Sequence, residues 1–299
     1  MAAERICVIF NPAAKGHKAR RFLDSLKKIA SEAELRPTSK PGDGRPLAAA
    51  AVRDGFETIV AAGGDGTLNE VINGIGDEPA GFEQTRLGVV PLGTVNVFAR
   101  ELKIPFQPDE AWELIRNGRE QRIDLPKAIF QAGGTQRQQY FAQLAGAGLD
   151  SRAIARLDLQ LKNRIGKFAY IWAGVRALSE DQTRITVRSR PFSGEAELVL
   201  VGNGRYYGGN FVLFPKAVLQ DGLLDVTVFP RVNWTAAAGF FLGWATGRPD
   251  RAGGSIQFQT DSLSITCDQR LPIELEGDNV GDLPAEITIC PGRLRVICR

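Results

Sequence analysis

A glycine-rich turn, GGDGT at residues 63–67, is the stretch of this sequence best suited to chemistry. It follows an apolar run and precedes a segment with helical spacing. Glycines at such a turn let the backbone approach a ligand closely, and the N–H groups at a helix start bind anions. The turn therefore predicts a phosphate cradle, in which Thr67 can donate a hydroxyl hydrogen bond.

Asp65 sits inside this turn and brings a negative charge to a place suited to phosphate. Two interpretations follow. The carboxylate either faces a Mg²⁺ ion that lies beside the phosphates, or it caps the helix that begins here. The turn alone gives the two interpretations even weight.

Two further polar turns, FNPAAKG at 10–16 and PLGTVN at 91–96, also lie where predicted strands end. Ligands of open parallel sheets bind at the carboxyl ends of the strands. Neither a P-loop motif nor a protein-kinase HRD motif is present. The single histidine, His17, excludes most His-based catalytic sites, so acid–base chemistry falls mainly to carboxylates.

The elements that position these turns divide the chain into two parts. Residues 1–125 alternate apolar strands with amphipathic helices, which predicts βαβ units, a parallel sheet and an α/β N-terminal nucleotide-binding domain. Strands are expected at 4–10, in the segment 57–66 that ends in the glycine turn, and at 86–93, and helices at 17–35, at 45–54, directly after residue 66, and at about 94–101.

Residues 126–299 read differently, as short β-branched segments with alternating polarity and one long helix near 151–180. They predict a β-rich, antiparallel, sandwich-like C-terminal domain. A return of the last strand to the first domain stays open. The expected strands lie at 140–149, 183–189, 195–203, 223–229, 261–267, 271–277, 284–290 and 294–298.

Composition excludes several classes of protein. A net charge of +3 and the lack of a basic–aromatic module argue against nucleic-acid binding. The four cysteines form no CxxC pair, which favours buried thiols over a disulfide framework or a zinc site. No apolar run is long enough for a bilayer and no leader pattern opens the chain, so we expect a cytoplasmic protein.

Taken in order, the motifs resemble one known family. GGDGTLNEVINGI (63–75) followed by PLGTVNVFAR (91–100) is similar to the diacylglycerol kinase catalytic-domain family, which includes bacterial soluble lipid kinases and relatives that act on sphingosine and ceramide. Later segments, among them LAGAGLDS (144–151) and ELEGD (274–278), match the second domain of that family. The resemblance covers nearly the whole chain.

This resemblance implies that ATP binds in a cleft at the turns described above. For Glu70, an ordinary role as a polar residue of the helix start stays open. Carried over by position, the nucleotide contacts are Asn11, Thr38, Gly63, Gly64, Asp65, Gly66, Thr67, Leu68, Asn69 and Thr94.

The family places its catalytic base in a DGE segment, where this chain has EGD. The resemblance puts Glu276 at the base position and Asp278 two residues further on. The family commonly carries an acid where this chain has Val97. That acid belongs to a carboxylate–Mg²⁺ network which by position includes Asp65, Asp278 and Asp124. For Asp124, a plain turn at the domain junction is an equal alternative.

PKAVLQDGLLDV (215–226) resembles the structural Mg²⁺ loop of the family. By position, Asp221 supplies a side chain, and Val218 and Leu223 supply backbone carbonyls. The alternative is a simple β-turn around Asp221 and Gly222.

The leading hypothesis is an ATP- and Mg²⁺-dependent kinase of a lipid hydroxyl, on diacylglycerol or a sphingoid base. One alternative is a NAD or small-molecule kinase of the same superfamily. Another is a nucleotide- or lipid-binding sensor without catalysis, which Val97 and the exchanged acids favour. The resemblance is compatible with a homodimer. Peripheral membrane contact through the aromatic segment 233–247 is set against a core role for that segment.

Overall fold

The computed structural model describes most of the chain. The expected helix at 151–180, most of the one at 17–35 and nearly all of segment 233–247 lie outside the described residues. The described residues are 5–12, 22, 24, 29, 31–148, 183–207, 209, 211–233, 239 and 254–299. Among them, no helix combines the length and apolar composition that a bilayer crossing requires.

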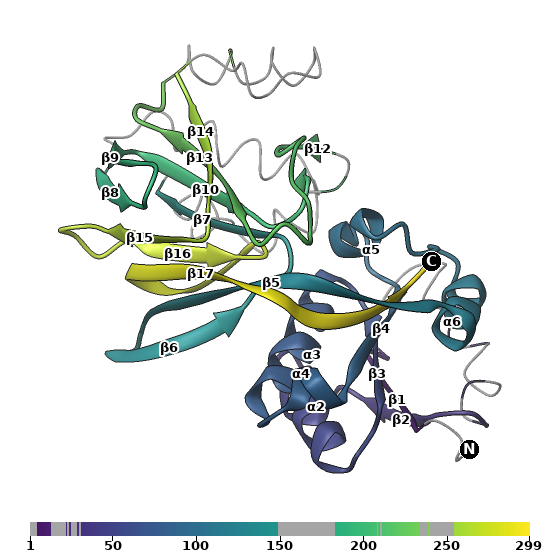
Figure 1. The fold of residues 1–299 in the computed structure, drawn as a ribbon. Coiled ribbons are helices and arrows are strands. Elements are labelled where there is room, and N and C mark those ends of the chain that lie inside the picture. The colour runs from purple at the N-terminus through teal and green to yellow at the C-terminus, as the bar shows by residue number, and fades with distance from the viewer. Residues whose placement is uncertain are drawn as a thin grey trace. The chain divides into compact units, whose positions relative to one another are not determined.

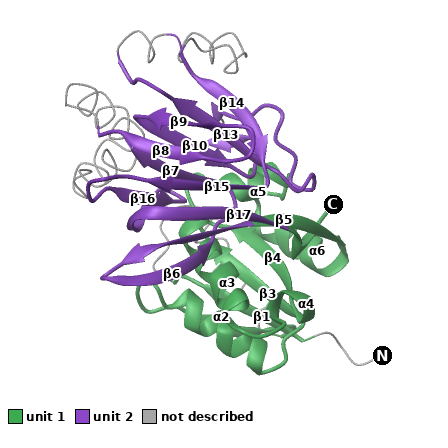
Figure 2. Ribbon diagram, turned by 60° about the vertical axis from the view of Figure 1, so that its left-hand side comes forward, with its two compact units in different colours: residues 1–125, 208–210, 291–299 green, residues 126–207, 211–290 purple. Residues whose placement is uncertain are grey.

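The chain divides into two units (Figure 2). The first comprises residues 1–125, 208–210 and 291–299, and the second comprises residues 126–207 and 211–290. Two long strands, β5 and β17, each contribute residues to both units (Figure 1).

The first unit is built on a parallel sheet in the order β4-β3-β1-β2. The end of β17 extends this sheet, since Val296 pairs in parallel with Leu87. The strands are β1 (Ile6–Phe10), β2 (Glu34–Pro37), β3 (Thr58–Gly63), β4 (Arg86–Pro91) and β17 (Asp278–Cys298). β3 is buried along its whole length, as expected for a central parallel strand.

The helices of this unit follow the strands in the rhythm that the sequence predicts. They are α2 (Gly44–Arg53), α3 (Asp65–Asp77), α4 (Gly81–Gln84), α5 (Val97–Glu101) and α6 (Pro108–Asn117). α5 begins three residues later than expected, because Asn96 has a left-handed backbone with φ of 52° that breaks helical continuity.

The second unit is antiparallel and β-rich. Its main sheet has the order β14-β13-β10-β7-β16-β17, and further strands pair off this path. The segments expected as separate strands at 284–290 and 294–298 form one strand, β17. The other strands are β5 (Arg119–Ala132), β6 (Thr135–Tyr140), β7 (Leu144–Gly148), β8 (Ile185–Arg188), β9 (Ser193–Ala196), β10 (Leu198–Gly202), β11 (Tyr206–Tyr207), β12 (Phe211–Val212), β13 (Leu224–Phe229), β14 (Ile256–Thr260), β15 (Ser262–Thr266) and β16 (Pro272–Leu275).

An apolar core holds this unit together. Alternate residues of β7, β10, β13 and β16 face it, such as Ala145, Val199, Val226 and Ile273. This period of two is the one that a sheet with one core-facing side requires. The fold class predicted from the sequence, an α/β domain followed by a β-rich domain, is therefore confirmed.

Candidate functional site

Four turns of the first unit lie at one edge of its sheet. Asn11 follows β1, Thr38 follows β2, Gly63 ends β3, and Thr94 lies just beyond β4. Because these strands are all parallel, their carboxyl ends meet at the same edge. The Thr38 N–H donates to the carbonyl of Phe10 at 2.8 Å, which ties the turns after β1 and β2 together.

The turns after β3 and β4 approach each other backbone to backbone. A Cβ placed on Gly93 would lie 2.5 Å from the Cα of Gly64, so this approach requires glycine at position 93, and a Cβ on Gly64 would make a tight contact of 3.3 Å with the Cα of Gly93. The Leu92 N–H also donates to the carbonyl of Gly63 at 2.9 Å. The result is a surface of glycine backbone at the start of α3.

Asp65 connects these two turns. Its carboxylate accepts hydrogen bonds from the backbone N–H groups of Asn96, Val97 and Phe98 at the start of α5. Burial raises the pKa of this carboxyl, and these three N–H donors, together with the N–H of Asp65 itself, partly offset that rise. Asp65 is the first residue of α3 and Gly64 its N-cap, so the interpretation of Asp65 as N-cap of its own helix is wrong.

The remaining cradle residues differ in what they can offer a ligand. Gly66 is exposed, and a Cβ added to it would meet nothing within 4 Å. Thr67 and Asn69 are half-buried, and the Asn69 carbonyl accepts a hydrogen bond from the Asn73 side chain at 2.9 Å. The Leu68 side chain is buried in the core, so Leu68 has only its backbone to offer.

Asn96 shapes the turn after β4 and was not singled out from the sequence. Its buried side chain accepts the Gly93 N–H at 3.0 Å and donates to the Gly93 carbonyl at 2.6 Å. Asparagine tolerates the left-handed backbone that this position has, which is the signal that sequence reasoning missed.

Asp124 lies within strand β5, where only 3% of the residue is exposed. Its Oδ1 accepts the N–H of Gly292 at 2.7 Å, which joins β5 to the end of β17 within the first unit. The alternative of a plain turn residue is therefore wrong.

In the second unit, Glu276 occupies the hairpin turn between β16 and β17. Glu276 and Gly277 both have positive φ, 57° and 88°, as a two-residue hairpin turn requires. The Glu276 Oε1 accepts the N–H groups of Ala142 and Gln143, both at 2.6 Å. The exposed Asp278 begins β17 directly after this turn.

A buried amide lies beside the Glu276 turn and was also missed from the sequence. Gln143 is 2% exposed, and neither polar atom of its carboxamide has a hydrogen-bond partner in the part of the chain that the structure describes. Its backbone is held on both sides, because its carbonyl accepts the Asn203 N–H at 2.8 Å.

The loop predicted to bind a structural Mg²⁺ combines a turn with two carboxylates. Asp221 Oδ1 accepts the Leu223 N–H at 3.0 Å, so this side chain bridges Gly222, which has a φ of 71°. One oxygen of Asp221 and one of Asp225 each lie 3.4 Å from the same Gln259 nitrogen. Burial, with the nearby Asp221 charge, raises the pKa of Asp225 to about 6.

This donor set fits a hard cation, because two close carboxylates leave excess negative charge and Mg²⁺ prefers oxygen. Val218, the predicted carbonyl donor, is 48% exposed. Among the described residues, no three His, Cys, Asp or Glu side chains gather as a metal site. A cation here would therefore depend on backbone carbonyls and water for its other ligands.

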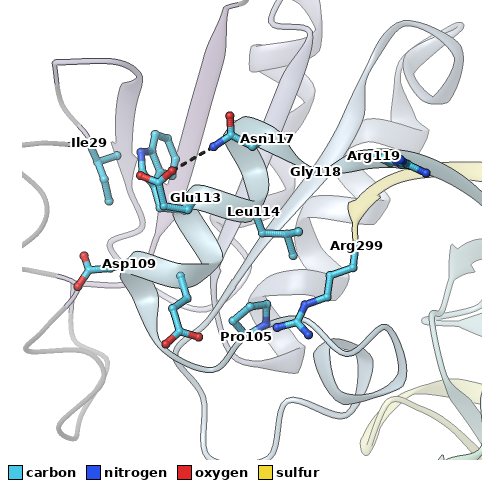
Figure 3. Close-up of a pocket in the computed structure, with 11 residues that line it drawn as sticks. Ile29, Pro105, Asp109, Glu113, Leu114, Asn117, Gly118, Arg119 and Arg299 are labelled. Atoms are coloured by element: carbon cyan, nitrogen blue, oxygen red, sulfur yellow. Dashed lines mark hydrogen bonds between the residues drawn. The ribbon is translucent and has the colours of Figure 1, made fainter.

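A cavity of about 650 Å³ lies along α6 in the first unit (Figure 3). Its lining includes Pro105, Leu114 and Arg299, and the Asn117 side chain donates to Glu113 there at 3.0 Å. None of the predicted site residues lines this cavity, so it is separate from the glycine turns.

The chain thus combines a parallel α/β unit, which has glycine turns at the carboxyl edge of its sheet, with an antiparallel β-rich unit. Comparison with known proteins gives the family. The diacylglycerol kinase catalytic domain matches residues 5–128, and the YegS C-terminal NAD kinase beta sandwich-like domain matches residues 143–298. The chain therefore belongs to the diacylglycerol kinase family.

Individual relatives are named as lipid kinases or diacylglycerol kinases, which agrees with this family. A protein of Xanthomonas oryzae pv. oryzae named "Probable lipid kinase YegS-like" is 34% identical over 93% of this chain and 90% of the relative. A "Diacylglycerol kinase" of Staphylococcus carnosus is 29% identical over 94% of this chain and 91% of the relative. A crystal structure of a diacylglycerol kinase from Bacillus anthracis shares the fold, with a TM-score of 0.79 at 24% identity, covering 100% of this chain and 98% of that chain.

Proposed function

We propose that this protein transfers the γ-phosphate of ATP to a hydroxyl of diacylglycerol or of a related lipid such as a sphingoid base. Membership of a lipid kinase family implies ATP as the phosphoryl donor. The observation that carries the proposal is the contact of two glycine turns, at Gly64 and Gly93, at the carboxyl edge of the parallel sheet. Such a surface suits the close approach of phosphate oxygens.

In this proposal the first unit holds the nucleotide. The N–H groups at the start of α3 face the phosphates, and Asn11, Thr38 and Thr94 supply polar contacts from the neighbouring turns. Asp65 keeps the turn after β4 in place through its bonds to the start of α5. Its role is then to shape the cradle as well as to add charge to it.

The second unit supplies the base. Glu276 would accept the proton of the attacking lipid hydroxyl, since two amides hold its carboxylate at a defined position. Mg²⁺ bound with the phosphates supplies charge neutralisation during phosphoryl transfer. Asp278 and Asp124 are the further carboxylates that we assign to this charge network. Asp221, with the carbonyls of Val218 and Leu223, would hold a second, structural Mg²⁺.

The test is phosphate transfer from ATP with Mg²⁺ to diacylglycerol, monoacylglycerol, sphingosine and ceramide in mixed micelles, with NAD⁺ as a further acceptor. We expect one lipid product, lost in Asp65→Ala. Transfer to NAD⁺ alone, or to no acceptor, would contradict the proposal.

Gly66→Ala separates ligand contact from folding. The added methyl meets open space in the protein, and alanine favours a helix by about 1 kcal/mol over glycine. We expect an unchanged or higher Tm without ligand and a KM for ATP raised about tenfold or more by the crowding of the phosphates. An unchanged KM would show that the phosphates bind elsewhere.

A sensor without catalysis is the second candidate, because the apolar Val97 stands where the family commonly has an acid. Stabilisation by ATP in thermal unfolding, with no transfer to any acceptor of the panel, would favour it.

A further inference from the structure

Glu70 lies in the second turn of α3 and reaches across to the loop at residues 38–43, here named the Thr38 loop. Its Oε1 accepts the N–H of Gly42 at 2.8 Å, and its Oε2 accepts the N–H of Gly44 at 2.8 Å. Both carboxylate oxygens are therefore bound to backbone donors that are 26 and 28 residues away in sequence.

The fit of this carboxylate is close. A Cβ on Gly44 would lie 2.6 Å from Glu70 Oε2, and Gly42 has a φ of 92° that favours glycine. Gly44 is also the first residue of α2, so the negative charge of Glu70 lies at the positive end of that helix. An ordinary surface glutamate has neither feature.

The Thr38 loop is also closed on itself. Asp43 Oδ2 accepts the N–H groups of Ser39 and Lys40 at 2.8 and 3.0 Å. These bonds connect Asp43, which lies between Gly42 and Gly44, to the two residues that follow Thr38. The Thr38 N–H is bonded to the carbonyl of Phe10 at the end of β1, so hydrogen bonds fix both ends of the loop.

We infer that Glu70 is a positioning residue, which fixes the Thr38 loop relative to the glycine turn at the start of α3. This inference rests on the proposed function, in which ATP contacts both Thr38 and the turn at 63–66. Glu70 would act on nucleotide affinity through the Thr38 loop without touching the nucleotide.

A second link between the same two helices provides a matched control. Asp77, the last residue of α3, forms a two-point ion pair with Arg45 of α2, with N–O distances of 2.6 and 2.7 Å. This pair joins α3 to α2 as Glu70 does, but it contacts the side chain of Arg45 and not the backbone of the Thr38 loop. Asp77→Asn therefore reports the effect of loosening the helix pair alone.

The experiment compares Glu70→Gln with Asp77→Asn in ATP titration calorimetry, in steady-state kinetics and in thermal unfolding. Glutamine keeps one acceptor oxygen, so the variant should fold. We expect the Kd and KM for ATP to rise about tenfold in Glu70→Gln, with kcat within about twofold, and to stay unchanged in Asp77→Asn. Equal losses of ATP affinity in both variants at equal Tm would overturn the inference.

A double-mutant cycle with Thr38→Val tests the route of the effect. If Glu70 acts through Thr38, the two changes in ATP affinity are not additive, because removal of the Thr38 hydroxyl leaves Glu70 little to position. Additive losses would overturn the inference.

The calorimetric readout separates the inference from the proposed function. ATP binding that depends on Glu70, without phosphate transfer to any lipid, supports the inference and contradicts the kinase proposal. Lipid phosphorylation by a protein whose ATP affinity is unchanged in Glu70→Gln supports the kinase proposal and contradicts the inference. An absence of ATP binding in the unmodified protein overturns both.

Discussion

Replacement of Glu276 by glutamine should separate two roles of this residue that an alanine variant would mix. One role is the proposed abstraction of a proton from the lipid hydroxyl. The other is structural, because Glu276 Oε1 accepts two backbone N–H groups, of Ala142 and Gln143, both at 2.6 Å. A glutamine side chain keeps a carbonyl oxygen for these donors, but it cannot accept the substrate proton.

The expected magnitudes differ accordingly. A hydrogen bond to a charged group contributes about 1.5–3 kcal/mol and a neutral one about 0.5–1.5 kcal/mol. Glu276→Gln should therefore lower the free energy of unfolding by about 1–2 kcal/mol, since Glu276 is half-buried and water competes there. Glu276→Ala leaves both amides without this acceptor and should cost about 2–4 kcal/mol. Loss of a general base lowers kcat by about 10²–10⁴ in both variants.

The assay pairs urea unfolding with initial rates of lipid phosphorylation at saturating ATP. Asp278→Asn is measured beside it, because Asp278 is the second acid of this turn in the proposed charge network, is exposed and lies two residues further along the chain. If Glu276→Gln keeps kcat within about threefold of the unmodified protein, Glu276 is not the base and its carboxylate serves the turn alone. A large loss of kcat in Asp278→Asn instead would assign the base to Asp278.

Two further predictions concern buried groups. Gln143→Leu removes a buried carboxamide that has no partner among the described residues, so the free energy of unfolding should rise by about 1 kcal/mol, as thermal unfolding would show. A fall in stability would mean that the amide is bonded in solution. Burial raises the pKa of Cys7 to about 12, so its thiol should resist alkylation at pH 8–9 in the native protein and react once the chain is unfolded. The half-buried Cys267 is the internal reference, and equal native reactivity of the two thiols would contradict the burial.

The sequence predicted the architecture well because each half has a clear hydrophobic period. Long apolar runs that end in glycine gave β3 and β4, and alternating runs gave β13, β15 and β16. It missed the hairpin of β5 and β6, because the second of these strands, TQRQQY, is almost wholly polar and exposed and shows no alternation. It also missed α6, although Ala111, Trp112 and Ile115 lie on one buried face at helical spacing, because the helix is only ten residues long.

The candidate site was harder to predict for a different reason. Residue type and motif spacing indicate which side chains carry charge, but they do not show which backbone groups those charges meet. Asp65 binds amides of residues 96–98, Glu70 binds those of Gly42 and Gly44, and Glu276 binds those of Ala142 and Gln143. None of these contacts is local in sequence, so no local sequence pattern predicts them.

These three carboxylates share a consequence for the chemistry. Each is bound to backbone donors of a neighbouring turn, and a lost acid would therefore both remove a charge and release a loop. A fall in activity on its own cannot distinguish these effects, because a buried amide that loses its acceptor costs about as much free energy as many catalytic interactions contribute. The matching amide variants, Asp65→Asn, Glu70→Gln and Glu276→Gln, keep one acceptor oxygen for the loop and remove the charge. They, and not the alanine variants, decide which acids act on substrate and which act on the protein itself.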